Sequence, residues 1–163
     1  MKIFLIGMPG SGKSVIGKQL ALHFNLPFID LDTAIESAEG KSVQDIFKEN
    51  GEAHFRQIEA EQLRELSSSS TGFVMATGGG TPCFHKGMEV IKKNGVSVYL
   101  NVPLPELVKR NSKSSTRPLL QDGDIENKLA ALLAVRATIY SSATFTIHGD
   151  QISIKALIAL LRK

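Results

Sequence analysis

A glycine-rich segment near the start of the chain has the residue types and spacing of a phosphate-binding loop. It reads Gly-Met-Pro-Gly-Ser-Gly-Lys-Ser from Gly7 to Ser14, directly after the apolar run Ile3–Ile6. Glycines permit backbone angles that a Cβ forbids, so successive N–H groups can turn inward around phosphate oxygens. Lys13 brings a positive charge to the β- and γ-phosphates, and the Ser14 hydroxyl is a ligand for Mg²⁺. The segment predicts binding of a nucleotide's phosphates but leaves the phosphate acceptor open.

Two acidic residues end the next strand-like segment. Asp30 and Asp32 are spaced at i and i+2, which in an extended chain places both side chains on the same side. The later strand-like run Phe73–Ala76 ends in Thr77 and offers no Walker-B-type acid. We therefore expect the metal carboxylate to come from Asp30 or Asp32. The ordinary alternative for either residue is a helix N-cap.

An arginine lies on the apolar face of a predicted helix near the C-terminal end. Leu129, Leu132, Leu133 and Tyr140 form the apolar stripe, and Arg136 is at i+7, i+4 and i+3 from the three leucines. An inward-facing arginine needs an anion or hydrogen-bond acceptors. Two interpretations follow: a buried structural ion pair, or a substrate carboxylate, which a guanidinium binds bidentately.

A second arginine lies between two glutamates on one line of a predicted helix. Glu52, Arg56 and Glu59 are spaced at i, i+4 and i+7. Glu59 can hold the Arg56 guanidinium in place. The ordinary alternative is an exposed ladder of salt bridges.

Three adjacent glycines follow the strand-like run Phe73–Ala76. Gly78, Gly79 and Gly80 lie at its carboxyl end, where ligands bind in parallel sheets. Without side chains they let a ligand approach the backbone closely, and the alternative is a flexible turn.

A long polar connection runs from Asn111 to Asp124. Long loops in compact domains often act as lids. A lid that closes over ATP excludes water and delivers a cation to the transferring phosphate. We predict such a lid at about residues 111–124, with Arg117 as its cation. A solvated charge is the alternative for Arg117 and for Lys113.

The elements that position these residues alternate between strands and helices. Strand-like apolar runs lie at 2–6, 27–29, 73–76, 96–100 and 144–148, with helical stretches between most of them. This alternation predicts an α/β fold with a mostly parallel sheet covered by helices on both faces. Residues 36–50 predict two short helices broken at Gly40-Lys41, and a further helix leads from Gly51 to about Leu66.

Bulk composition narrows the class of protein. With 163 residues, 42% of them hydrophobic, the chain can bury one core, and we expect a single domain over residues 1–163. A net charge of +3 from interspersed Lys and Arg favours small anionic ligands over nucleic acid. Cys83 is the only cysteine, the four histidines lack metal-ligand spacing, and no apolar run reaches membrane-spanning length. We expect a cytoplasmic protein without nucleic-acid or membrane partners.

Taken together, the motifs resemble those of the shikimate kinase family in order and spacing. They are Gly7–Ser14, Asp30-Leu31-Asp32, Gly51-Glu52…Phe55-Arg56…Glu59, Thr77–Gly80, Arg117-Pro118-Leu119-Leu120 and Arg136…Tyr140. The resemblance implies a three-layer α/β/α fold with a central five-stranded parallel sheet, of the nucleoside-monophosphate-kinase type. It also implies phosphorylation of the 3-hydroxyl of shikimate with ATP and Mg²⁺, in the synthesis of aromatic amino acids. We expect the protein to be a monomer.

The resemblance also implies roles for individual residues. The nucleotide contacts it implies are Gly10, Ser11, Gly12, Lys13, Ser14, Val15, Arg110 and Arg117. The shikimate contacts it implies are Asp32, Arg56, Gly78, Gly79, Gly80 and Arg136, several of them in a helical segment at about 32–60. Mg²⁺ is assigned to Ser14 and, through water, to Asp30. Asp32 is the implied base, Lys13 and Arg117 stabilise charge on the phosphoryl group, and Glu59 orients Arg56.

Two departures from the family pattern and two other functions are also part of the prediction. Val15 stands where the family often has Thr, and residues 148–152 do not clearly show the adenine-contacting pattern.

A kinase for another small hydroxylated acid, such as gluconate, shares the phosphate loop but does not require two arginines, Asp32 and three glycines in one pocket. A regulatory ATP- or GTP-binding module is the other alternative, although the chain has no Asn-Lys-x-Asp guanine signature.

Overall fold

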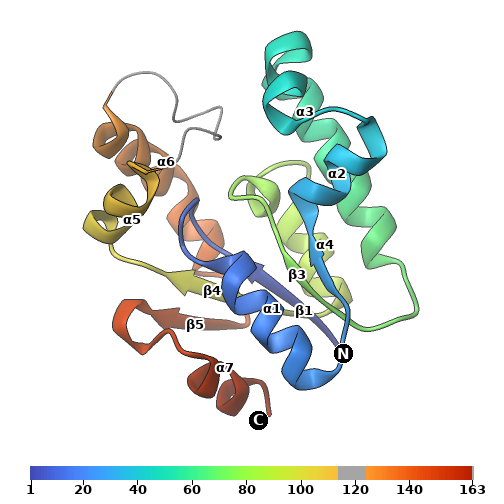
Figure 1. Ribbon diagram of the computed structural model, residues 1–163, viewed down its shortest axis with the longest axis vertical. Coiled ribbons are helices and arrows are strands. Elements are labelled where there is room, and N and C mark those ends of the chain that lie inside the picture. The colour runs from blue at the N-terminus through green and yellow to red at the C-terminus, as the bar shows by residue number, and fades with distance from the viewer. Residues whose placement is uncertain (114–123, 163) are drawn as a thin grey trace.

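A parallel β-sheet forms the centre of the computed structural model, which describes residues 1–113 and 124–162 (Figure 1). The five strands lie in the order β2-β3-β1-β4-β5, and each hydrogen-bonded pair of neighbours is parallel. They are β1 (Lys2–Ile6), β2 (Phe28–Asp30), β3 (Phe73–Ala76), β4 (Val96–Asn101) and β5 (Phe145–His148). The predicted sheet, its strand number and its parallel pairing are confirmed.

Helices cover both faces of the sheet. They are α1 (Lys13–Phe24), α2 (Leu31–Glu39), α3 (Val43–Ser67), α4 (Gly87–Asn94), α5 (Leu104–Asn111), α6 (Ile125–Tyr140) and α7 (Ile154–Leu161). Two short 3-10 turns, η1 (Thr81–Cys83) and η3 (Gly149–Gln151), follow β3 and β5. None of the helices in the described part of the chain combines the length and the apolar character that crossing a bilayer requires.

Strand β1 shows how its continuous apolar sequence serves two cores. Ile3 and Leu5 pack into a cluster with residues of α1 and α7, whereas Phe4 and Ile6 pack into a cluster with residues of α3, α4 and α6. All four side chains are fully buried. Because successive side chains of a strand point to opposite faces, a central strand covered on both sides has to be apolar throughout. The chain is therefore built in three layers, helix on sheet on helix.

The helical segment after β2 differs in detail from the prediction. The break at Gly40 is confirmed, because Gly40 caps α2 with a φ of 67°. The predicted boundary at Gly51 is a kink: α3 continues through it, with Gly51 alone in a non-helical conformation at φ 81° and ψ 172°. Only glycine adopts these angles without strain, so the kink is a property of that position. It separates a first half that lies away from the sheet from a second half that packs near η1 and α4.

Candidate active site

The loop between β1 and α1 has the backbone of an anion site. Gly10 and Gly12 have φ values of 80° and 90°, and Gly12 is the residue that precedes the first turn of α1. Since the first N–H groups of a helix lack partners within the helix, those of α1 face the loop with the positive end of the helix dipole. The loop therefore fits a phosphate group, as predicted.

Lys13 folds back over this loop. Its Nζ donates hydrogen bonds to the carbonyl oxygens of Gly7 and Met8, both at 2.9 Å, and to Ser11 Oγ at 3.3 Å. Lys13 is only 9% exposed. These contacts hold the buried ammonium against the loop, where its positive charge suits a bound phosphate.

Ser14 and Asp30 form a pair of oxygen ligands beside the loop. Ser14 Oγ donates to Asp30 Oδ2 at 2.6 Å, and Asp30 Oδ1 accepts from the backbone N–H of Thr33 at 3.4 Å. The N-cap interpretation of Asp30 is therefore correct, and its position next to the Ser14 hydroxyl is compatible with the metal role, which stays a prediction. Hydroxyl and carboxylate oxygens suit Mg²⁺, which takes its other ligands from phosphate and water. These residues fit the predicted metal.

Asp32 lies in the first turn of α2, and the expectation that it continues an extended chain is wrong. Capping by Asp30 starts the helix at Leu31, two residues earlier than an extended chain through Asp32 allows. Burial raises the pKa of Asp32 to about 6, and the negative charges of Glu59 and Asp30 act in the same direction, while Lys13 opposes them. A carboxylate with this pKa is ionised at pH 7 and is a stronger base than an ordinary aspartate.

Arg56 and Glu59 form a buried ion pair on the second half of α3. Arg56 Nη1 donates to Glu59 Oε1 at 2.9 Å, and Thr81 Oγ1 donates to Glu59 Oε2 at 2.7 Å. Arg56 is 5% exposed and Glu59 is 1% exposed. The contact by which Glu59 was predicted to hold Arg56 is therefore present, and the interpretation of this pair as an exposed ladder is wrong. Thr81 was missed, because its contact depends on the turn that follows β3.

Arg136 is buried on α6, where none of the described residues is an acidic partner. It is 3% exposed, and no carboxylate of the described residues lies within 4.0 Å of its guanidinium. The part of the chain that the structure describes therefore does not contain the structural ion pair that was one of the two interpretations of Arg136. A buried cation that the protein does not neutralise provides a site for an anionic ligand.

The three glycines after β3 make room for these charged side chains. An ideal Cβ at Gly78 would lie 2.7 Å from Glu59 Oε2, one at Gly79 would lie 3.0 Å from Arg136 Nη1, and one at Gly80 would lie 2.5 Å from Arg56 Cζ. Real Cβ atoms do not tolerate the first and last of these distances. The groups that approach the backbone closely in the structure are the protein's own arginines and glutamate, and the approach of a ligand stays a prediction.

One cavity of about 700 Å³ joins the phosphate loop to the two arginines. The predicted residues that line it are Gly10, Ser11, Gly12, Lys13, Ser14, Val15, Asp30, Asp32, Arg56, Glu59, Gly78, Gly79, Gly80, Arg110 and Arg136. Apolar walls that were not predicted as site residues come from Val43, Phe47, Phe55 and Leu132. The stripe of apolar residues along α3 was visible in the sequence, but its exposure to a cavity depends on how α3 packs.

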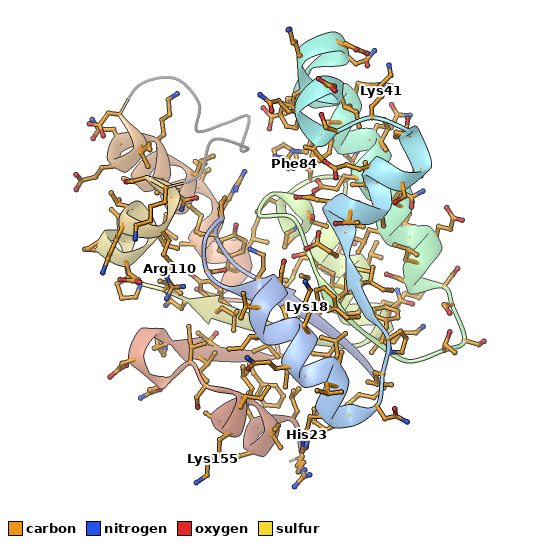
Figure 2. All side chains as sticks on the ribbon, in the orientation of Figure 1. Lys18, His23, Lys41, Phe84, Arg110 and Lys155 are labelled. Carbon is orange, nitrogen blue, oxygen red and sulfur yellow. The ribbon has the colours of Figure 1, made fainter. Side chains whose placement is uncertain are left out.

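The nucleotide end of the cavity is open to solvent. Arg110, labelled in Figure 2, donates from Nη1 to the carbonyl oxygen of Gly10 at 3.1 Å and from Nε to Glu106 at 2.8 Å. Val15 is 67% exposed at the cavity wall, which is where a threonine hydroxyl is missing. Gly149 and Ile152 also line the cavity, so the segment whose sequence did not show an adenine pattern does reach this end. Arg117 lies outside the described residues, as does most of the predicted lid.

Comparison with known proteins decides the family. A model of the shikimate kinase family matches residues 9–161. The chain belongs to the shikimate kinase family. A shikimate kinase from Clostridium botulinum is 43% identical over 162 residues, which cover 98% of this chain and 94% of that protein. The predicted family membership is confirmed.

Solved shikimate kinases share the fold over almost the whole chain. The structure from Bacteroides thetaiotaomicron has a TM-score of 0.92 at 36% identity and covers 100% of this chain and 99% of that one. The structure from Acinetobacter baumannii, in complex with shikimate, has a TM-score of 0.91 at 35% identity and covers 99% and 90%. A deoxyadenosine kinase at 14% identity, with a TM-score of 0.65, shares the fold alone. These comparisons give no support to the gluconate alternative.

Proposed function

We propose that this chain transfers the γ-phosphoryl group of ATP to the 3-hydroxyl of shikimate. One observation carries the proposal: two buried arginines, Arg56 and Arg136, line the same cavity as the phosphate loop, and Arg136 has no carboxylate partner among the described residues. A cavity that suits polyphosphate at one end and a carboxylate at the other matches ATP and a small hydroxylated acid. The family to which the chain belongs is named for that acid.

The donor half of the site holds the nucleotide by its phosphates. Residues Gly10–Ser14 surround the β- and γ-phosphates with backbone N–H groups, and the Lys13 ammonium neutralises charge that develops as the phosphoryl group moves. Ser14 and Asp30 hold Mg²⁺ when it is bound, and the ion neutralises phosphate oxygens there. The residues of this half already contact one another, so binding of the nucleotide requires no rearrangement of β1 or α1.

The acceptor half orients the acid and prepares its hydroxyl. Arg56 and Arg136 bind the carboxylate, which fixes the ring in the cavity over Gly78–Gly80. Asp32 accepts the proton of the 3-hydroxyl as that oxygen bonds to the γ-phosphorus and ADP leaves with the bridging oxygen. The raised pKa of Asp32 fits this role, because a base is most effective when its pKa is close to the working pH.

Two further assignments complete the proposal. Residues 111–124 act as the lid, and Arg117 supplies its cation. The start of this segment is fixed to the phosphate loop, since Asn111 Nδ2 donates to the carbonyl oxygen of Pro9 at 2.9 Å, and a movement there would reach the nucleotide.

One chain supplies the whole described cavity, which fits a monomer of a single domain. A reducing cytoplasm with ATP fits the lone Cys83.

The test is shikimate-dependent release of ADP with Mg²⁺ present. We expect ADP to appear with shikimate, not with gluconate or a nucleoside monophosphate, and phosphorus NMR of the product to show a phosphate ester on the 3-oxygen. Chelation of Mg²⁺ is expected to stop the reaction, and added Mg²⁺ to restore it. Nucleotide binding without product formation on shikimate would contradict the proposal.

A further inference from the structure

The hydrogen bonds of Arg56 leave a specific part of its guanidinium unused. Arg56 carries five N–H donors. Nε and Nη2 each donate to Glu52 Oε1 at 3.3 Å, and Nη1 donates to Glu59 Oε1 at 2.9 Å. These are the acceptors that Arg56 reaches among the described residues, so one N–H on Nη1 and one on Nη2 have no partner there. Two N–H groups on neighbouring nitrogens are what a carboxylate needs for bidentate binding.

The faces of the same guanidinium are also covered. The Cζ atom lies 4.5 Å from the centre of the Phe84 ring, and the Gly80 backbone is so close that a Cβ there would lie 2.5 Å from both Cζ and Nη2. Phe84 is labelled in Figure 2 beside the upper part of α3. A guanidinium that is stacked on a ring and packed against backbone cannot tilt freely. The only motion of the Arg56 guanidinium that these contacts leave free is rotation within its own plane.

We propose that Glu52 is a positioning residue that supplies this restraint. Glu59 alone holds one nitrogen and would let the group pivot, whereas Glu52 holds the opposite edge through two N–H donors. Together the two glutamates direct the unused N–H pair of Arg56 at the substrate carboxylate. This inference rests on the proposed function, because it takes Arg56 as the carboxylate ligand.

The position of Glu52 supports an orienting role over an ordinary surface contact. Glu52 directly follows the kink at Gly51, so it lies on the second half of α3 and keeps the i, i+4 relation to Arg56. Its side chain is 44% exposed, but its partner is only 5% exposed. Holding a buried, already packed guanidinium costs little further side-chain entropy, unlike the pairing of two exposed side chains. Lys41 and Glu49 form such an exposed pair, with exposures of 49% and 52%.

Three variants separate orientation from charge. Glu52→Ala removes the acceptor, and we expect the KM for shikimate to rise about five- to tenfold while the KM for ATP stays within about twofold. Glu52→Gln removes the charge but keeps an acceptor oxygen, and it is expected to restore most of the loss. Glu49→Ala is the matched control, because it removes a comparably exposed carboxylate from the same helix away from the cavity, and it should leave both KM values unchanged.

The substrate can be changed as well as the protein. The methyl ester of shikimate lacks the anionic carboxylate, so Glu52→Ala should alter its affinity far less than that of shikimate. If Glu52→Ala leaves the KM for shikimate unchanged, or if Glu52→Gln raises it as much as the alanine variant does, the positioning role is wrong. An equal loss for the ester and for shikimate would also overturn it.

A measurement without substrate keeps this inference distinct from the proposed function. In the free protein, the Nε–H signal of Arg56 in NMR spectra is expected to exchange slowly with water and to report a rigid guanidinium. Glu52→Ala should speed the exchange and Glu49→Ala should not. Absence of ADP release by the wild-type protein with shikimate would contradict the proposed function alone, whereas an unchanged Arg56 signal in Glu52→Ala would contradict the role of Glu52.

Discussion

The hydroxyl of Tyr140 donates a hydrogen bond to the carbonyl oxygen of Gly79, joining the last residue of α6 to the glycines that lie against the arginines. The same hydroxyl lies 3.8 Å from Met8 Sδ in the phosphate loop. Burial raises the pKa of Tyr140 well above its usual range, although Arg136 beside it acts in the opposite direction. The tyrosine therefore remains a protonated donor under all ordinary conditions and connects the two halves of the site.

Tyr140→Phe should disturb the acceptor half of the site more than the donor half. The ring stays packed against Tyr99, whose centre is 5.1 Å away, but the Gly79 carbonyl loses its partner. We expect the free energy of unfolding to fall by about 1–2 kcal/mol, the cost of an unsatisfied buried polar group. The KM for shikimate should rise by about threefold or more, with a smaller change for ATP. Denaturant unfolding and steady-state kinetics measure the two effects, and an equal rise in both KM values would contradict the prediction.

Asp32→Asn should make the protein more stable and the enzyme much slower. The pKa of Asp32 is about 6 in the folded chain and 3.8 in the unfolded reference, so the folded state binds more protons between these values. Stability therefore falls as pH rises through that interval, by at most about 3 kcal/mol, and remains lower at pH 7. The asparagine variant lacks the titrating carboxyl and should not show this fall. Loss of the base should lower kcat by about 10²- to 10⁴-fold.

The stability part of this prediction is measured on protein freed of metal with a chelator. Denaturant titrations at several pH values from 4 to 7 give the free energy of unfolding of both proteins. The difference between Asp32→Asn and the wild-type protein should grow with pH across this range. A difference that shrinks with increasing pH would show that Asp32 is stabilised, not destabilised, in its ionised form.

Gly80→Ala should affect the acceptor half through Arg56. The new Cβ would lie 2.5 Å from Arg56 Cζ, so the guanidinium has to move away from the position that its two glutamates define. We expect the KM for shikimate to rise by about tenfold or more and the KM for ATP to change little. Gly40→Ala is the control: it meets no atom within 4 Å but is strained by its φ of 67°. It should cost about 1 kcal/mol of stability and leave both KM values unchanged.

The sequence predicted best those parts of the site that depend on neighbouring residues along the chain. The phosphate loop is one such part, because Gly10–Ser14 act largely through their own backbone. Arg136 is another, since a charged residue on the apolar face of a helix is expected to be buried, whichever residues pack against that face. The strands were predicted from apolar runs because a sheet covered on both faces tolerates little else, as β1 shows.

Contacts between distant segments could not be predicted in the same way. The Tyr140 hydroxyl meets a carbonyl that is 61 residues away in the chain, and Thr81 meets Glu59 across 22 residues. Each contact depends on where two packed elements place their ends, which periodicity does not determine. Asp32 was wrongly placed in extended chain because the helix cap at Asp30 competes with strand geometry at the same residues. Gly78–Gly80 suggested a site for a ligand, but their packing against Glu59, Arg136 and Arg56 became visible only with the side chains in place.

Arg136→Lys should weaken shikimate binding while nucleotide binding and the fold are retained. Lysine keeps the positive charge, but it offers a single ammonium in place of the planar pair of N–H groups that binds a carboxylate bidentately. Because Arg136 has no carboxylate partner among the described residues, its replacement breaks no ion pair there, and stability should change by less than about 1 kcal/mol. Calorimetric titration should show shikimate affinity falling by about tenfold or more and ATP affinity within about twofold. Equal weakening of both ligands would show that Arg136 supports the cavity as a whole and does not bind the acid.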